Sequence, residues 1–259
     1  MKTRDHVTFY LNGKRQEVAA EQSRMMLSDY LRYEKSLVGT KGVCAEGDCG
    51  ACSVLKLYPH KTPQGSRNDF ISMNSCIMTV AQVDGASLVT VDALAKENDE
   101  GIELSPVQKA MVACHGSQCG FCTPGFVVAI TDAIEKKICS KAKGCNLTAQ
   151  EAKNATTGNL CRCTGYQPII DAATSIDYSK SESVAQRFYS KEQEKDLKKI
   201  QSTPLMVSGD TFSIYAPKTA KDAAKYLAKN KNVRIVAAAT DLGVVTNKGK
   251  IKLDKILSL

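Results

Sequence analysis

Two stretches decide the fold of this chain: Ser117-Gln-Cys-Gly-Phe-Cys-Thr-Pro-Gly125 and Gly158-Asn-Leu-Cys-Arg-Cys-Thr-Gly-Tyr166. They carry two short thiol pairs, Cys119 with Cys122 and Cys161 with Cys163. On a regular helix, residues i and i+2 point about 200° apart, so a C-x-C pair cannot share one centre there. We therefore predict irregular backbone around the second pair, with all four thiols converging on one metal centre. The spacing leaves the metal open, because C-x2-C with C-x-C also suits zinc.

Helix signals surround these cysteines. Three helices are predicted to begin at Ser105-Pro-Val-Gln108, at Thr123-Pro124 and at Thr148-Ala-Gln-Glu151. The first and third have a capping box, and proline at the first helical position suits a helix start. The second would bury one apolar face, formed by Phe126, Val127, Ile130, Ile134 and Ile138. The third would end at Gly158. Cys122 would lie just before the second helix, whose positive end favours thiolate or cluster charge.

A second cysteine set lies earlier, in Gly42-Val-Cys44-Ala-Glu-Gly47-Asp-Cys49-Gly50-Ala-Cys52, with Cys76 farther on. The spacing C-x4-C-x2-C with a distant fourth cysteine is that of plant-type [2Fe–2S] ferredoxins. Glycines at 42, 47 and 50 permit positive φ and let backbone N–H groups approach the sulfurs. A four-cysteine zinc site normally shows two C-x2–4-C pairs, so this spacing favours iron.

The residues around this set predict a small α+β unit. Asn12-Gly13 separates strand-like residues 7–11 from 16–18, a strong hairpin signal. Ser23 is predicted to cap a helix whose apolar face is Met26, Leu27, Tyr30 and Leu31. Further strands are predicted at 52–58, 70–73 and 87–91.

The remainder of the chain predicts a linker and a third unit. Residues 179–203 are rich in alternating charge, which is typical of a partly helical linker. Beyond them we predict a strand at Phe212–Tyr215, a helix at about 219–230, a strand at Val233–Ala237 and another at Ile251–Leu253. This β-α-β order suits a nucleotide-binding fold.

Composition narrows the function. The chain has 259 residues, eleven of them cysteine, and a formal net charge of +8. We expect no signal peptide, no membrane span and a cytoplasmic protein, in which thiolate–metal ligation is favoured over disulfides. Residues 218–259 hold ten Lys or Arg against three Asp but one aromatic residue, Tyr226, so no nucleic-acid partner is expected. Cys114, Cys139 and Cys145 belong to neither set, and His115 is expected to be structural.

Taken together, these motifs resemble the small iron–sulfur/FAD subunit of bacterial xanthine dehydrogenases, in the molybdenum hydroxylase (xanthine oxidase) family. The resemblance covers residues 5 to about 178, through the motifs ending at Cys52, Asn74-Ser-Cys76, His115–Gly125 and Gly158–Tyr166. Two such motif sets in this order are highly specific.

The resemblance implies an α+β chain of several parts. Residues 1–93 would form a β-grasp ferredoxin-like domain, and 94–178 an all-α domain that binds a second [2Fe–2S] cluster. Residues 179–203 would be the linker, and 204–259 the incomplete N-terminal part of an α/β FAD-binding domain. The implied cluster ligands are Cys44, Cys49, Cys52 and Cys76 in the first domain, and Cys119, Cys122, Cys161 and Cys163 in the second.

The family also implies partners. Gln118 and Cys119 would contact a molybdopterin carried by a separate large subunit, which would hold the hydroxylation site. Electrons would pass from that cofactor through both clusters towards FAD and NAD, in a purine or related heterocycle hydroxylase. Alternatives are a subunit of another molybdenum hydroxylase acting on aldehydes or heterocycles, a free-standing two-cluster carrier, and a zinc-stapled interaction module.

Two positions depart from the family pattern. Val43 stands where glycine usually precedes the first ferredoxin-type cysteine. The implied FAD pyrophosphate loop is Val236, Ala237, Ala238, Ala239, Thr240, Asp241 and Leu242. Alanines 238 and 239 replace the usual Gly-Gly, and a methyl group obstructs close approach of backbone to phosphate. The chain stops at Leu259, short of a full FAD domain, so we expect either that FAD binding requires a further polypeptide or that this chain is a fragment.

Overall fold

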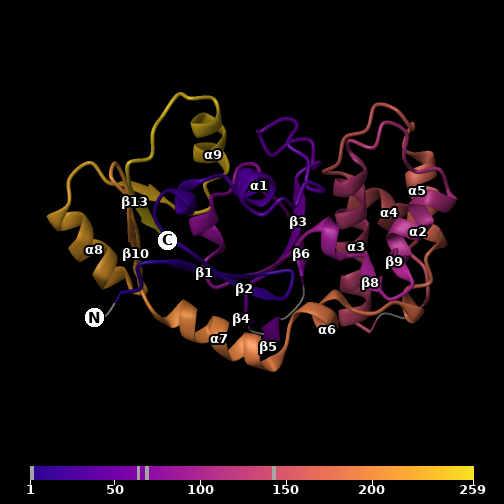
Figure 1. The fold of residues 1–259 in the computed structure, drawn as a ribbon, viewed down its shortest axis with the longest axis horizontal. Coiled ribbons are helices and arrows are strands. Elements are labelled where there is room, and N and C mark those ends of the chain that lie inside the picture. Colours follow the sequence, from indigo (N-terminus) through magenta and orange to yellow (C-terminus); the bar gives the residue numbers. More distant parts are fainter. Residues whose placement is uncertain (1–2, 63–64, 68–69, 142–143) are drawn as a thin grey trace.

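The computed structural model describes residues 3–62, 65–67, 70–141 and 144–259. Three units lie in a row along the long axis of the molecule (Figure 1). The sheet of the N-terminal unit lies in the middle. The helices of residues 106–175 lie at one end, and the C-terminal unit lies at the other.

The N-terminal unit is a five-stranded mixed sheet in the order β2-β1-β7-β3-β6. Its strands are β1 (Val7–Leu11), β2 (Lys14–Val18), β3 (Ser53–Leu57), β6 (Ile71–Asn74) and β7 (Ser87–Val89). The predicted hairpin is confirmed: Asn12 and Gly13 both have positive φ, of 51° and 80°, which a two-residue turn of this type requires. The strands predicted at 52–58, 70–73 and 87–91 are also present.

The helix predicted after Ser23 begins later than expected. Helix α1 (Leu27–Asp29) starts after Met26, and residues 30–34 continue it as a wider turn. Ser23 is buried and its Oγ donates to the Ala20 carbonyl instead of capping α1. The cause is a tertiary contact, because Met26 forms a β-bridge with Thr79 and keeps this stretch extended.

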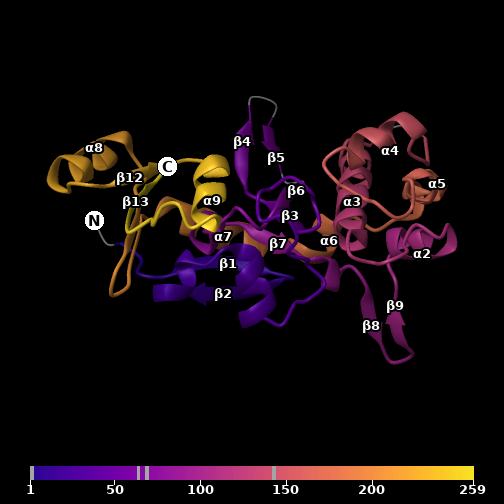
Figure 2. The same cartoon turned by 90° about the horizontal axis from the view of Figure 1, so that it is seen from above.

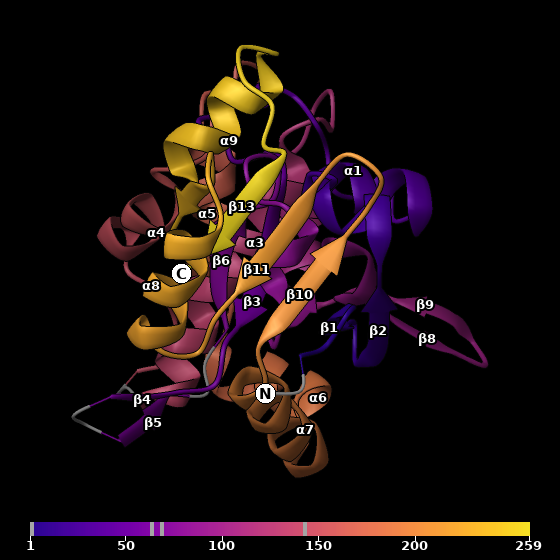
Figure 3. The same cartoon turned by 90° about the vertical axis from the view of Figure 1, so that its left-hand side faces the viewer.

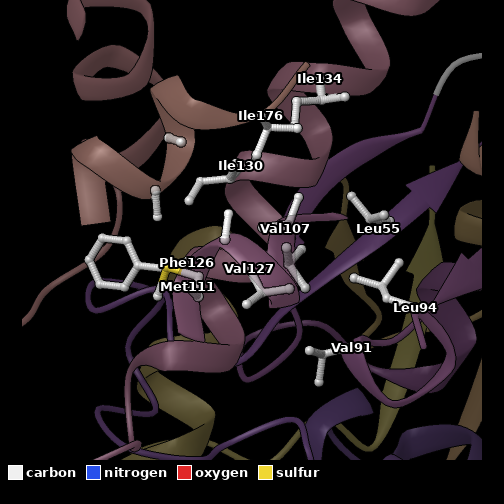
Figure 4. Close-up of a cluster of buried hydrophobic side chains, with 14 of the residues drawn as sticks. Leu55, Val91, Leu94, Val107, Met111, Phe126, Val127, Ile130, Ile134 and Ile176 are labelled. Atoms are coloured by element: carbon white, nitrogen blue, oxygen red, sulfur yellow. The ribbon is translucent and has the colours of Figure 1, made fainter. Parts of the chain in front are cut away.

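The helical unit agrees closely with the predicted starts and ends. It comprises α2 (Pro106–Ala113), α3 (Thr123–Cys139), α4 (Ala149–Thr156) and α5 (Gln167–Ser175). Ser105 and Thr148 form the two predicted capping boxes. Helix α3 is the centre of the unit, and its Phe126, Val127, Ile130 and Ile134 lie in the hydrophobic cluster of Figure 4.

Two hairpins were not predicted from the sequence. One pairs β4 (His60–Thr62) with β5 (Gly65–Arg67), and the other pairs β8 (Lys96–Asn98) with β9 (Gly101–Glu103). Both project from the body of the molecule (Figure 2). All residues of β8 and β9 are exposed, so the apolar alternation that reveals a half-buried strand is missing from them.

The predicted linker is helical and packed along most of its length. It contains α6 (Val184–Phe188) and α7 (Lys191–Ser202). Helix α7 buries Leu197 and Ile200, and its Asp196 carboxylate accepts a hydrogen bond from the Tyr10 hydroxyl of β1 at 3.0 Å. The segment that leads to the C-terminal unit therefore packs against the N-terminal sheet.

The C-terminal unit is a four-stranded sheet in the order β10-β11-β13-β12 (Figure 3). Its elements are β10 (Leu205–Ser208), β11 (Ser213–Ala216), α8 (Ala220–Lys229), β12 (Arg234–Val236), α9 (Thr240–Asn247) and β13 (Lys255–Ser258). The strand predicted at 251–253 was wrong in position. Strand β13 lies between two parallel neighbours, and such a strand is buried on both faces. The consecutive buried pair Ile256 and Leu257 satisfies this condition.

Hydrophobic cores are shared between the units. Leu55, Leu57 and Phe70 of the N-terminal unit pack in the cluster built around α3. A second cluster joins Phe9 and its neighbours to Leu205 and other residues of the C-terminal unit. In the part of the chain that the structure describes, no helix combines the length and the apolar composition needed to cross a bilayer.

Candidate metal centres

The first cysteine set lies at one end of the N-terminal sheet. Cys44, Cys49 and Cys52 lie on the loop that leads into β3, and Cys76 follows β6. Cys49, Cys52 and Cys76 are buried, and Cys44 is half-buried. The structure thus brings together, on two facing loops, the four thiols that the sequence singles out.

Left-handed backbone lets the loop wrap this region. Gly47 and Gly50 have φ values of 75° and 69°, as the sequence predicted. Gly42 does not have positive φ, and open space surrounds it, so the prediction for that glycine was wrong. The left-handed position near the first cysteine is Ala45 instead, with φ of 55°. Val43 is exposed, so its side chain does not obstruct the loop.

The thiols of the first set lie in two contacting pairs. The backbone N–H groups of Cys49, Glu46 and Asp48 outweigh the effect of burial and lower the pKa of Cys44, while burial raises the pKa of its neighbour Cys49. The Cys76 thiol donates to Cys52 and lowers the pKa of Cys52 to about 6, and the same contact raises the pKa of Cys76. Cys44 therefore pairs with Cys49, and Cys52 with Cys76.

The second set lies where helices of the helical unit begin and end. Cys119 and Cys122 precede α3, and Cys161 and Cys163 lie on the loop between α4 and α5. That loop is irregular, as the C-x-C geometry required. Cys161 is buried and Cys122 half-buried, whereas Cys119 and Cys163 are exposed.

These thiols also form two pairs. The Sγ atoms of Cys163 and Cys119 lie 3.5 Å apart. The Phe121 N–H and then the Cys163 thiol lower the pKa of Cys119, and the contact with Cys119 raises the pKa of Cys163. The pKa of Cys122 is raised to about 12, mainly by burial and secondly by the contact with Cys161.

Hydrogen bonds also favour the thiolate form of Cys161. Burial opposes ionisation, but hydrogen bonds from Thr164 and Cys163 lower the pKa of Cys161 to about 7. The backbone N–H of Cys161 donates to the Tyr166 hydroxyl at 3.0 Å. Sequence reasoning missed these two supporting residues, although Thr164-Gly165-Tyr166 directly follows the cysteines.

Thiols in pairs suit a two-iron cluster better than a single zinc ion. Each tetrahedral iron of a [2Fe–2S] cluster takes two cysteine thiolates, and the structure offers two such pairs in each set. In each pair one thiol is inclined towards thiolate and its neighbour holds the proton, and binding of metal would release that proton. Within the described residues, no three His, Cys, Asp or Glu side chains are arranged to hold one metal ion.

The two cysteine loops contact each other directly. The backbone N–H of Leu160 donates to the Cys49 carbonyl at 3.0 Å, and Leu160 immediately precedes Cys161. A Cβ on Gly125 would lie 2.2 Å from the Gly50 carbonyl oxygen, so α3 also touches the first loop. The sequence contains no signal for this contact, because its partners are more than 70 residues apart.

Two apolar side chains are exposed close in sequence to the thiols of the second set. Phe121 and Leu160 are about half exposed, and Gln118 lies exposed beside Cys119. The structure therefore presents Gln118 and Cys119 on an outer face, as contact with another molecule would require.

The predicted FAD loop lies in the C-terminal unit, which is separated from the helical unit by the N-terminal sheet (Figure 1). Val236 is the buried last residue of β12, and Ala239, with φ of 58°, precedes α9. Ala237, Ala238 and Thr240 line a cleft of about 960 Å³, whose other wall includes Glu46 and Gly47 of the first cysteine loop. The loop residues Asp241 and Leu242 lie in the first turn of α9.

The remaining cysteines and His115 belong to neither of the two cysteine sets. Cys114 packs at the edge of the helical core, and Cys139 and Cys145 are exposed. His115 is exposed, has φ of 55° and ends the segment of α2. The structural role of His115 stays a prediction.

Two family models match parts of this chain. Residues 9–81 match the model of the 2Fe-2S iron-sulfur cluster binding domain, and residues 90–174 match that of the [2Fe-2S] binding domain. The chain is thus a protein with two [2Fe–2S]-binding domains in tandem.

Individual proteins place it more closely. The chain is 37% identical to a xanthine dehydrogenase of Blastobotrys adeninivorans over 66% of its own length and 11% of that protein. It is 31% identical to an indole-3-acetaldehyde oxidase of Zea mays over 92% of its length and 20% of that protein. A solved quinoline 2-oxidoreductase from Pseudomonas putida 86 contains a chain that matches with a TM-score of 0.53 and 30% identity, over 69% of this chain and 95% of that one.

The chain therefore belongs to the molybdenum hydroxylase family, in the part formed by the iron–sulfur regions of xanthine dehydrogenases and aldehyde oxidases. It spans only 11% and 20% of the two curated relatives named above.

Proposed function

We propose that this chain is the electron-transfer subunit of a molybdenum hydroxylase of the xanthine dehydrogenase type. Two [2Fe–2S] clusters would supply reversible one-electron chemistry between a molybdopterin on a large partner subunit and FAD, with NAD as the distal acceptor. Hydroxylation of the substrate would belong to the partner, and this chain would contain no catalytic residue. A subunit of an aldehyde- or heterocycle-oxidising enzyme is the alternative within the same family. We place the complex in the cytoplasm.

The proposed ligands follow the thiol pairs. Cys44 with Cys49, and Cys52 with Cys76, would each hold one iron of the ferredoxin-type cluster. Cys119 with Cys163, and Cys122 with Cys161, would do the same for the cluster of the helical unit. All eight thiols would bind as thiolates, so binding of the clusters would release protons.

One observation carries the proposal: the hydrogen bond from the Leu160 N–H to the Cys49 carbonyl. Cys49 belongs to one cysteine set, and Leu160 adjoins Cys161 of the other. This direct contact brings the two sets close together, and electron transfer from one centre to the other requires such proximity. Two independent structural metal sites would not need it.

The exposed face of the helical unit supports the proposal that electrons enter the chain there. Cys119 and Cys163 are exposed beside Gln118 and the apolar Phe121, which suits docking of a large molybdopterin-binding subunit. The cleft between the Val236–Leu242 loop and Gly47 supports FAD at the other end. The Zea mays relative, which matches 92% of the chain, extends the similarity beyond the two cluster domains. We propose that residues 204–259 form only part of the FAD site and that further residues, of this protein or of another, supply the rest.

Electron paramagnetic resonance of the reduced full chain tests the proposal. We expect two distinct [2Fe–2S] signals, with about four iron atoms and four sulfides per chain. Cys161→Ser should disturb one signal and leave the other unchanged. A single signal in the wild type, or zinc in place of iron, would refute the two-cluster assignment. Elution of the iron-loaded chain without a molybdenum-containing partner from its native source would favour a free-standing carrier.

A further inference from the structure

Helix α9 returns from the C-terminal unit to the first cysteine set (Figure 1). Its last residue, Asn247, donates from Nδ2 to the Ala45 carbonyl at 2.8 Å and to the Cys76 carbonyl at 2.8 Å. A side-chain amide nitrogen carries two N–H donors, so one asparagine satisfies both bonds.

The two carbonyls belong to different loops of the same site. Ala45 directly follows Cys44 and has the left-handed φ of 55°, a conformation that costs free energy for a residue with a Cβ. Cys76 supplies the fourth thiol from the facing loop. Asn247 thus connects the first and last cysteines of the set through a side chain that lies about 170 residues or more from both in sequence.

Two further contacts, at Gly243 and at Lys248, show how closely α9 approaches the first cysteine set. A Cβ on Gly243 would lie 2.3 Å from the Ile77 carbonyl oxygen, so glycine is required where the helix crosses the residue after Cys76. Lys248, the next residue after Asn247, forms an ion pair with Glu46 at 2.6 Å. Three successive contacts therefore hold the C-terminal unit against both loops.

We propose that Asn247 is a positioning residue for the ferredoxin-type centre: its amide clamps the Cys44 loop to the Cys76 loop and places two N–H dipoles beside the centre. The inference rests on the proposed function, because it requires that Cys44 and Cys76 be ligands. Hydrogen bonds beyond the ligands orient them and tune a centre's reduction potential.

The charge distribution of the Asn247 amide determines the direction in which its loss shifts the reduction potential. The positive ends of the amide dipoles face the loops around a centre that gains negative charge on reduction. Loss of the two donors makes reduction harder, and a carboxylate at the same place makes it harder still. The potentials are therefore expected in the order wild type above Asn247→Ala above Asn247→Asp, for this cluster alone.

The experiment is a redox titration of the full chain, loaded with iron and sulfide and followed by paramagnetic resonance. The helical-unit cluster, identified by the Cys161→Ser variant, is an internal reference within every sample. The matched control is Asn230→Ala, because Asn230 also ends a helix of the C-terminal unit and its Nδ2 donates to the Tyr226 carbonyl at 2.8 Å, away from both cysteine sets.

The expected result is a shift to lower potential of the ferredoxin-type signal in both Asn247 variants, with faster loss of its iron to a chelator. The second signal should stay unchanged, and Asn230→Ala should match the wild type. Equal shifts of both signals, a shift in Asn230→Ala, or no shift in Asn247→Asp would each overturn the clamp. An intact second signal shows that a variant has folded. Absence of the ferredoxin-type signal from the wild type would instead overturn the proposed function.

Discussion

The contact between the two cysteine loops can be tested with Gly125→Ala. Gly125 lies in the first turn of α3, where alanine is intrinsically better than glycine by about 1 kcal/mol. The new methyl group would lie 2.2 Å from the Gly50 carbonyl oxygen and 2.9 Å from Asn159 Nδ2. Both distances are below van der Waals contact, and the first partner is backbone that cannot rotate away.

Helix propensity favours alanine at position 125, whereas the clash with Gly50 and Asn159 disfavours it. The clash should cost more free energy than the propensity provides. Forcing a methylene-sized group into a packed site typically costs about 1–3 kcal/mol. The net expectation is a loss of about 1–2 kcal/mol of unfolding free energy, in place of the gain that helix propensity alone predicts. The displacement should also separate Gly50 from Asn159 and lengthen the Leu160–Cys49 hydrogen bond.

Urea unfolding of the full chain measures the first effect, and the magnetic interaction between the two clusters measures the second. Gly158→Ala is the matched control, because Gly158 lies in the adjacent loop, has no positive φ and has open space at its Cβ position. That control should be neutral or stabilising by about 0.4–1 kcal/mol. If Gly125→Ala stabilised the protein as much as Gly158→Ala, the proposed close contact between the loops would be refuted.

Three further outcomes follow from the structure. The buried Glu135 carboxylate accepts hydrogen bonds from the Ser183 hydroxyl and from two backbone N–H groups at the start of α6. Glu135→Ala should therefore lower the free energy of unfolding in urea by about 2–3 kcal/mol, and Glu135→Gln by clearly less. Equal losses in the two variants would contradict this role. Tyr166→Phe removes the acceptor of the Cys161 N–H and should cost about 1 kcal/mol, with faster chelator-driven iron loss from the helical-unit cluster only. The hydrogen bond from Lys137 lowers the pKa of Glu151 to about 2. The stability that this pair provides should therefore be complete above pH 4.5 and be lost as the pH falls towards 2. Thermal unfolding of a Glu151→Gln variant across this pH range should lack that part of the acid dependence.

Much of the fold could be predicted because its signals are local. Capping boxes at Ser105 and Thr148 and the Asn12-Gly13 turn each act within a few residues, and each is present as predicted. The irregular backbone at Cys161 and Cys163 could also be predicted, since two residues at this spacing on a helix cannot point to one centre. The thiol pairs could not, because which two thiols share a partner depends on how two distant loops meet.

The errors in the prediction have the opposite cause. Ser23 satisfies the local rule for a helix cap, but the Met26–Thr79 bridge overrides that rule. The strand expected at residues 251–253 forms at 255–258, because the middle position of the sheet requires two consecutive buried residues. In both cases a tertiary contact with a distant segment decided the local structure.

Tertiary contacts also place the first cysteine set at the boundaries between the units. The loop that carries Cys44 and Cys49 is held from one side by Leu160 of the helical unit and from the other by Asn247 of the C-terminal unit. Neither contact exists within residues 1–93, although all four thiols of the first set do. A fragment limited to those residues would also expose Leu55, Leu57 and Phe70, which the helical unit covers. The properties of the first centre therefore belong to the assembled chain, and a change in either neighbouring unit should alter how that centre accepts and passes on electrons.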